Sequence, residues 1–150
     1  MQRNLSHQKS LAPFIYIFLF IIYGSLSSIY LFLPPLLAVL FVLFLKAMDK
    51  KDFLLLMLVS FCLVLFEANK GYMIFSTIVY FALVYKFVMP KIIQNFSCNS
   101  CVNITLVLLA YLGYYIYLVV LSNVFLLPSP ELNFYVLYYI VIEFFLVSLL

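Results

Sequence analysis

The sequence alternates long apolar runs with short polar or charged segments. The apolar runs cover residues 11–33, 35–48, 53–66, 72–89, 103–127 and 134–150. A bilayer core about 30 Å thick takes roughly 20 helical residues per crossing, and the runs do not follow the alternating pattern of strands. The pattern therefore predicts an all-α fold, in which residues 1–150 form a single integral membrane domain, a bundle of six short transmembrane helices.

The composition agrees with lipid as the solvent. Apolar residues make up 69% of the chain and charged residues 9%, and the mean hydropathy is +1.26, so the chain would aggregate in water. The formal net charge of +3 is small and arises from cationic segments between the runs. It favours contact with anionic lipid headgroups and gives no reason to expect nucleic acid as a partner.

The Lys and Arg residues decide between four and six crossings. The runs 35–48 and 53–66 are short enough to lie at the interface instead of crossing. Without them the cations divide equally between the two sides, whereas with six crossings only Lys70 falls outside, as the positive-inside rule favours. We therefore predict a multi-pass protein of the bacterial inner membrane with both termini cytoplasmic. Its cytoplasmic cations are Arg3, Lys9, Lys46, Lys50, Lys51, Lys86 and Lys91.

The beginning of the chain also loosely imitates a cleavable signal peptide, with a basic start, an apolar run and small residues at 24–28. That segment lacks a clean A-x-A pattern, and the apolar run resumes at once. We expect the first run to be retained as a helix.

Groups able to carry catalysis are few. The chain has one histidine, His7, and its five carboxylates are scattered over separate segments. Zinc requires three or four converging ligands, and the only close pair of candidate ligands is Cys98 and Cys101. We therefore expect a protein that is not an enzyme and that holds neither a metal nor a cofactor.

Cys98 and Cys101 form a C-x-x-C motif, a pattern that can lower the pKa of a thiol and cycle between dithiol and disulfide. Membrane thiol oxidoreductases of the disulfide-forming or vitamin K epoxide reductase type need a second cysteine pair, and here only Cys62 is left, inside an apolar run. The motif also falls in a predicted cytoplasmic segment, where disulfides are disfavoured. A redox pair is the less favoured of the alternatives.

Glu143 is the most costly residue to bury, because it lies near the middle of the last predicted span. Tyr135 and Tyr139 precede it by two turns and one turn, so all three share one helix face. In the preceding span, Tyr114 is expected at a depth similar to that of Glu143, which predicts a hydrogen bond between them. A tyrosine-rich seam that joins the last two helices is favoured over an ion or substrate site.

Residues 61–85 read FCLVLFEANKGYMIFSTIVYFALVY, and this segment resembles the MreD family of rod shape-determining membrane proteins. Members of that family are of about this length and almost wholly transmembrane. They usually have a proline at the start of the second span, as Pro34 and Pro35 provide here. They also carry an acidic residue and a Gly-containing turn after the third span, which Glu67 and Gly71 match.

The chain also departs from the family pattern, in which an aspartate is more often flanked by two glycines. Glu67 replaces the aspartate, and the flanking positions are held by Phe66 and Phe75. An acidic residue at such a place is also an ordinary solvated turn residue. Function at Glu67 is therefore a weaker expectation than the overall layout.

The resemblance implies a non-enzymatic subunit of the cell-elongation machinery that scaffolds peptidoglycan synthesis. Its implied partners are MreC and, through it, the filament protein MreB and the glycan polymerase and transpeptidase. The alternative is the substrate-binding membrane subunit of a vitamin-type transporter, because the family's bundle resembles such subunits. Its small ligand is expected between helices near the outer face, lined by Tyr135, Tyr138, Asn123 and Glu67.

Overall fold

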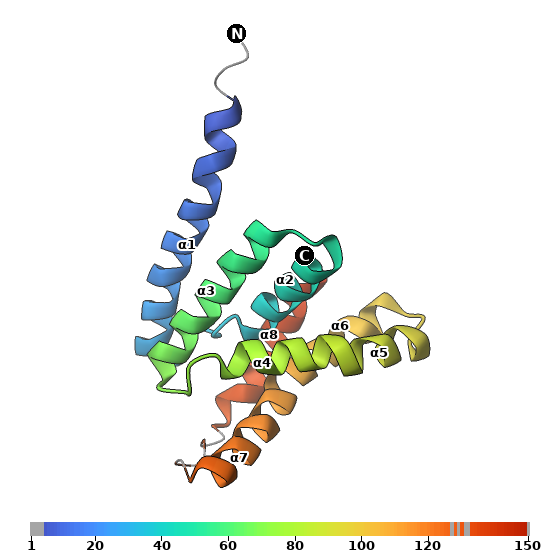
Figure 1. The fold of residues 1–150 in the computed structure, drawn as a ribbon. Helices are drawn as coiled ribbons and strands as arrows, with labels where there is room; N and C mark the ends of the chain where they lie inside the picture. Colours follow the sequence, from blue (N-terminus) through green and yellow to red (C-terminus); the bar gives the residue numbers. More distant parts are fainter. Residues whose placement is uncertain (1–4, 127, 129, 131–132, 150) are drawn as a thin grey trace.

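The computed structural model describes residues 5–126, 128, 130 and 133–149, with side chains from Ile15 onward. Arg3 therefore lies outside the described residues, as do the side chains of His7 and Lys9. Every regular element in the described part of the chain is helical, which confirms the all-α prediction (Figure 1). The elements are α1 (Leu5–Ile29), α2 (Leu37–Lys50), α3 (Phe53–Lys70), α4 (Ser76–Leu83), η1 (Val84–Val88), α5 (Met89–Asn95), α6 (Asn99–Leu108), η2 (Leu109–Gly113), α7 (Tyr114–Phe125) and α8 (Tyr135–Leu149).

The two π-helical segments, η1 and η2, lie inside longer helices. The first joins α4 to α5 and the second joins α6 to α7, which makes two continuous helices, Ser76–Asn95 and Asn99–Phe125. The fourth run was predicted to end at residue 89, before Pro90, but the helix continues for six more residues, to Asn95. A proline removes one intrahelical hydrogen bond and crowds the preceding turn, and the wider π-helical turn just before it gives room for the ring.

Length and composition identify three helices able to cross a membrane, Phe53–Lys70, Ser76–Asn95 and Asn99–Phe125. Two shorter apolar helices, Ile15–Ile29 and Tyr135–Leu149, accompany them. The 14 residues of α2 extend for about 21 Å, less than the thickness of a bilayer core. The fold is therefore that of a membrane protein in which the helices differ in how much of a bilayer they can span.

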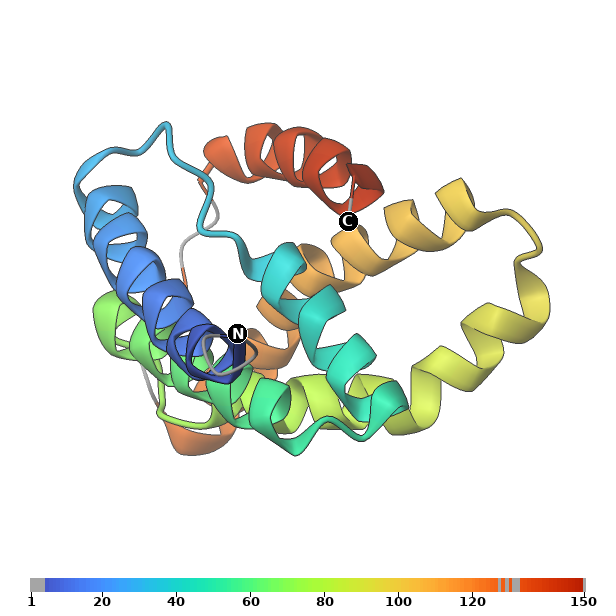
Figure 2. The same cartoon turned by 90° about the horizontal axis from the view of Figure 1, so that it is seen from above.

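The core is built around α2, in which residues 37–45 are all apolar. Figure 2 shows α2 among the other helices, and α3 and α8 both pack against it. Phe41 of α2 and Phe81 of α4 are fully buried, and their ring centroids lie 4.5 Å apart. A helical stretch that is apolar all round is stable only when neighbours cover it, so residues 37–45 of α2 lie at the centre of the bundle.

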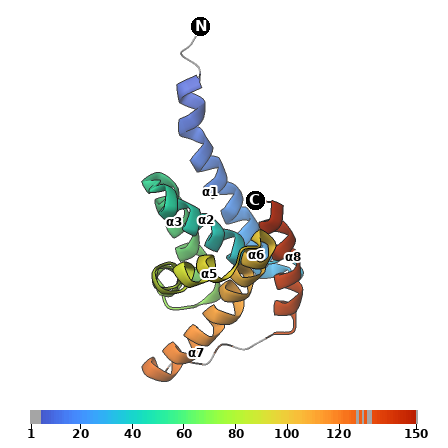
Figure 3. The same cartoon turned by 90° about the vertical axis from the view of Figure 1, so that its right-hand side faces the viewer.

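The outer helices leave much apolar surface uncovered. The second half of α1 packs along α3, while its first half extends away from the bundle (Figures 1 and 3). Ile15, Phe18 and Leu19 of α1 are all more than half exposed. Since a soluble protein rarely exposes so large an apolar surface, lipid or other membrane helices must cover it.

The ends of the helices gather at two sides of the molecule. The start of α1, the turn between α2 and α3 and the end of α8 lie at one side (Figure 1). The end of α1, the turn between α3 and α4 and the end of α7 lie at the other. We call this second side the Lys70 side, because Lys70 ends α3 there.

Candidate functional site

Glu143 of α8 is fully buried, and it caps the start of another helix. One carboxylate oxygen, Oε2, accepts a hydrogen bond from the backbone N–H of Ala38 at 2.6 Å. The other, Oε1, accepts one from the hydroxyl of Tyr111. Ala38 is the second residue of α2, where N–H groups have no intrahelical partner and the helix dipole is positive. The carboxylate that caps α2 therefore comes from another helix, α8.

The chain before α2 explains why this cap is needed. Pro34 and Pro35 have no backbone N–H, and Leu36 has a left-handed φ of 56° and provides no side-chain cap. The segment 31–36 is not helical and runs along α8, where the hydroxyl of Tyr139 donates to the carbonyl of Leu31. Glu143 lies about 12 Å along the helix axis from the start of α8, so α2 begins well inside the bundle. Non-helical backbone at that depth requires protein partners, which α8 supplies.

The predicted partner of Glu143 was wrong by one turn, because the hydroxyl that donates to it belongs to Tyr111 and not to Tyr114. The hydroxyl of Tyr114 instead pairs with Ser76 Oγ at 3.1 Å. The predicted face of α8 does act as one surface. Tyr135 lies edge-on to Phe32, with ring centroids 6.2 Å apart. Tyr139 donates a hydrogen bond to the carbonyl of Leu31, and Glu143 accepts one from the N–H of Ala38, so both contact the chain that leads into α2.

Glu67 is also fully buried, so the reading of this residue as a solvated turn residue is wrong. It lies in the last turn of α3, and its carboxylate turns to the start of α4. Oε2 accepts the backbone N–H of Phe75 at 2.6 Å. Oε1 accepts the backbone N–H of Thr77 at 2.5 Å, the hydroxyl of Ser76 at 3.1 Å and the hydroxyl of Thr77. The donors belong to Phe75, directly before α4, and to the first two residues of α4, so Glu67 caps this helix.

The turn between α3 and α4 depends on two left-handed residues. Gly71 has φ 71° and ends α3, and the N–H of Tyr72 returns to the carbonyl of Glu67 at 3.0 Å. Phe75 also has φ 71°, directly before α4, and offers no side-chain cap. A left-handed conformation is natural for glycine and costly for phenylalanine. The four donors that converge on Glu67 supply the compensating stabilisation.

The caps formed by Glu67 and Glu143 are both contacted by tyrosines of the helix Asn99–Phe125. Ser76 Oγ bonds both Glu67 Oε1 and the Tyr114 hydroxyl, each at 3.1 Å. Tyr114 lies three residues beyond Tyr111, whose hydroxyl bonds Glu143. The helix Asn99–Phe125 therefore carries one tyrosine for each cap. These bonds leave no buried side-chain nitrogen or oxygen without a partner in the described part of the chain.

A close contact between Tyr80 and Gly113 holds α4 against this same helix. The Tyr80 hydroxyl donates to the carbonyl of Leu109 at 2.8 Å, across the π-helical segment η2. A Cβ at Gly113 would lie 2.1 Å from that hydroxyl oxygen. Glycine is thus required by the approach of a tyrosine and not by its own backbone angles, which are ordinary for a helix.

We expect Gly113→Ala to destabilise the bundle by about 1–3 kcal/mol, the usual effect of overpacking a tight site. Tyr80→Phe removes the clashing oxygen, so adding it to Gly113→Ala should restore part of the lost stability. Tyr80→Phe alone should destabilise the bundle by about 1 kcal/mol, because a hydrogen bond is lost. The measurement is a denaturant titration in mixed micelles for both single variants and the double variant. Strictly additive effects would contradict the contact.

The cysteine pair lies at the start of α6. Cys98 is exposed and precedes the helix, whereas Cys101 is in its first turn, so the helix begins earlier than the predicted residue 103. Hydrogen bonds from the backbone and side chain of Cys101 lower the pKa of the Cys98 thiol. Both are free thiols, and Cys62 is buried in α3. The structure thus keeps Cys62 away from the predicted pair.

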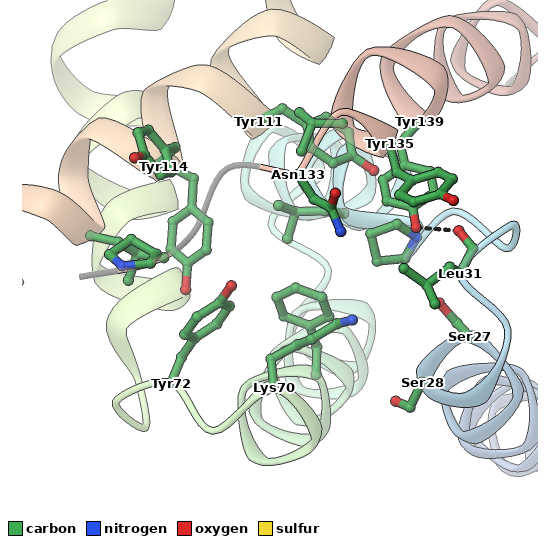
Figure 4. A pocket seen from close by; sticks show the side chains of 17 residues that line it. Ser27, Ser28, Leu31, Lys70, Tyr72, Tyr111, Tyr114, Asn133, Tyr135 and Tyr139 are labelled. Atoms are coloured by element: carbon green, nitrogen blue, oxygen red, sulfur yellow. Dashed lines mark hydrogen bonds between the residues drawn. The ribbon is translucent and has the colours of Figure 1, made fainter. Parts of the chain in front are cut away.

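A cavity of about 420 Å³ opens between the helix ends at the Lys70 side. Its walls come from α1, α3, α7 and α8, and Figure 4 shows tyrosines on several sides of it. Of the four predicted ligand-lining residues, Tyr135 lines this cavity, whereas Tyr138, Asn123 and Glu67 do not. The polar and aromatic lining includes Ser27, Lys70, Tyr72, Tyr111, Tyr114, Tyr115, Asn133, Tyr135 and Tyr139.

Sequence reasoning missed the roles of Ser76, Thr77 and Lys70. A signal was present for the first two, because Ser and Thr after a turn are typical of a helix start. No group of three or more His, Cys, Asp or Glu suited to a metal ion occurs among the described residues. No protein-family model matches the chain, and no curated protein or solved structure matches it either.

Proposed function

We propose that this protein is a non-enzymatic, multi-pass subunit of a bacterial cell-elongation complex in the inner membrane, similar to MreD, and that it scaffolds peptidoglycan synthesis. The proposal rests on the resemblance of residues 61–85 to that family. In this reading six helices cross the membrane and both termini are cytoplasmic. The start of α1 and the end of α8 lie at one side of the bundle, which agrees with an even number of crossings (Figure 1).

The observation that carries the proposal is the backbone at Phe75. The family more often has a glycine at this position, after the acidic residue. Here Phe75 has φ 71°, the conformation that glycine adopts without cost. A left-handed backbone at this position is what a family member with glycine there would adopt without strain, and this supports the resemblance.

A second support comes from how Glu67 is used. Its carboxylate accepts hydrogen bonds from Phe75, Ser76 and Thr77 at the start of α4, so the acidic residue of the motif builds a joint between two helices. A motif that shapes a helical hairpin suits a scaffold subunit, whose function is to bind partner proteins through its surface. The exposed apolar face of α1 is one such surface.

Photocrosslinking in the native membrane tests this function. A photoreactive amino acid at Phe18, which is 64% exposed on α1, should crosslink to an MreC-like protein or a wall transpeptidase. The same amino acid at Phe41, which is fully buried, is the matched control and should give no intermolecular product. Partners would be identified by mass spectrometry after purification under gentle conditions.

Recovery of no wall-synthesis protein, under conditions in which other membrane complexes stay intact, would contradict the proposal. Recovery of the ATPase module of a transporter would replace it with the transporter-subunit alternative. The two outcomes are distinguishable because the captured partners have different sequences.

A further inference from the structure

We propose that the cavity at the Lys70 side binds an anionic amphiphile, a molecule that carries a phosphate or carboxylate group on an apolar body. This binding does not depend on the elongation-complex function. It rests on the shape of the cavity, the sign of its charge and the hydrogen-bonding capacity of its walls. A volume of about 420 Å³ falls in the range of small-molecule sites, which is roughly 300–1,000 Å³.

Among the described residues that line the cavity, the charged side chain is cationic. Lys70 contributes an ammonium group, and none of the described residues that line the cavity is acidic. Glu67 and Glu143 do not line the cavity, because both are fully buried and their carboxylates accept hydrogen bonds at the starts of α4 and α2. An anion is the complement of such a lining.

The hydrogen-bonding groups of the walls divide into two sets. The hydroxyls of Tyr111, Tyr114 and Tyr139 are bonded within the protein. The side chains of Lys70, Tyr72, Tyr115, Asn133 and Tyr135 make no hydrogen bond or ion pair with another described residue. This second set can donate hydrogen bonds to the oxygens of a phosphate or carboxylate.

The positions of these groups suit a ligand with two unlike parts. Figure 4 shows Lys70, Tyr72 and Asn133 around the same space, with the tyrosines of α7 on one side and those of α8 on the other. The tyrosine rings, together with Phe66 and Leu118, form apolar walls. A ring or short acyl chain can pack between them while its charged group meets Lys70.

Two sources supply this chemistry, a phospholipid of the membrane and a free organic acid, and four probes distinguish them. Dihexanoylphosphatidylglycerol and dihexanoylphosphatidylcholine share an apolar body and differ in net charge. 1-Naphthoate and 1-naphthol share a ring and differ in the carboxylate. The full-length protein in a neutral detergent would be titrated with each, and the melting temperature followed, because a ligand of the folded state raises it.

We expect the anionic member of at least one pair to stabilise the protein in a saturable way and its uncharged partner to do so much less. Lys70→Gln should weaken that binding about 10-fold, the lower end of the range for a hydrogen bond to a charged group, because Lys70 is exposed. Lys91→Gln removes the same charge from an exposed position outside the cavity lining and is the matched control.

Stabilisation by the anionic lipid alone would identify a membrane lipid as the source, and stabilisation by naphthoate alone would identify a free acid. Three results would overturn the proposal. They are an equal response to charged and uncharged members of both pairs, no response to any probe, and a response to the anion that Lys70→Gln and Lys91→Gln leave equally intact.

Discussion

Replacing Glu67 with leucine should unfold the joint between α3 and α4 and lower the free energy of unfolding by about 2–6 kcal/mol, because each buried backbone donor left unpaired costs about 1–3 kcal/mol. The loss arises because the backbone N–H groups of Phe75 and Thr77 would be left in an apolar interior without acceptors. The left-handed Phe75 would then keep its strain without the bonds that offset it.

Glu67→Gln should also be harmful, by about 1–3 kcal/mol, because one carboxylate oxygen becomes an NH₂ group. Both oxygens of Glu67 face backbone N–H groups, which cannot accept a hydrogen bond. In either orientation of the amide, its NH₂ group would therefore face the N–H of Phe75 or of Thr77, and two donors cannot form a hydrogen bond. Denaturant titration in mixed micelles measures both variants, with Asp52→Leu as the control at an exposed acidic residue. A Glu67→Leu variant as stable as that control would contradict the cap.

Glu143 should respond differently to the same two changes. Glu143→Leu should cost about 2–6 kcal/mol, because the N–H of Ala38 and the hydroxyl of Tyr111 would lose their buried partner and each unpaired donor costs about 1–3 kcal/mol. Glu143→Gln should cost less than about 1 kcal/mol, since an amide can keep two hydrogen bonds here. Its oxygen accepts from Ala38, and its NH₂ donates to Tyr111, whose hydroxyl can accept as well as donate.

The contrast between Glu67→Gln and Glu143→Gln is therefore the informative readout. Unfolding of Glu143→Gln and Glu143→Leu should be followed by far-ultraviolet circular dichroism and compared with the parent protein. Equal losses from both would show that the negative charge of Glu143 is needed, and not only its hydrogen-bonding shape. In that case the residue would be a candidate for an ion or substrate site.

The helices themselves were largely predictable because the length and hydropathy of an apolar run are local properties of the sequence. The six predicted runs correspond to helical segments, with shifted ends, among the described residues. The end of α3 was placed too early, because Glu67 looks like a turn residue until α4 is seen to cover it. Burial of a charged side chain by a neighbouring helix start cannot be read from hydropathy.

The partner of Glu143 was missed for a different reason. Its depth was matched to Tyr114 on the assumption of a regular helix with about 1.5 Å per residue. The π-helical segment Leu109–Gly113 adds width to that helix and changes which tyrosine faces α8. Nothing in the local sequence YLGYY identifies this widening without Tyr80, which lies on another helix and contacts Leu109.

The cavity was foreseen only in outline, as a site near the outer face that includes Tyr135. Its walls come from the ends of helices that are distant in the chain, so its lining depends on how those ends pack. Lys70 was noticed only as the cation on the outer side. Its position beside Tyr72, across from the tyrosines of α7 and α8, emerges from the fold (Figure 4).

The membrane depth of both glutamates, the outward-facing cavity and the proposed inner-membrane subunit all depend on six crossings with cytoplasmic termini. Labelling of single cysteines by a membrane-impermeant maleimide tests this directly, in intact cells and in inside-out vesicles. The native Cys98 is exposed, and Cys101→Ser leaves it as the one cysteine that is not buried. Asp52→Cys and Asn133→Cys, both exposed positions, would be made after Cys98 and Cys101 are changed to serine, and the buried Cys62 can stay.

We predict that Cys98 and the cysteine at position 52 react only in inside-out vesicles, and that the cysteine at position 133 reacts only in intact cells. Reaction of position 52 from outside, with Cys98 still reacting only in inside-out vesicles, would mean that α2 and α3 do not cross, which is the four-span arrangement. Reaction of Cys98 from outside together with position 133 from inside would mean that the bundle is inverted, and either result would contradict the six-span topology.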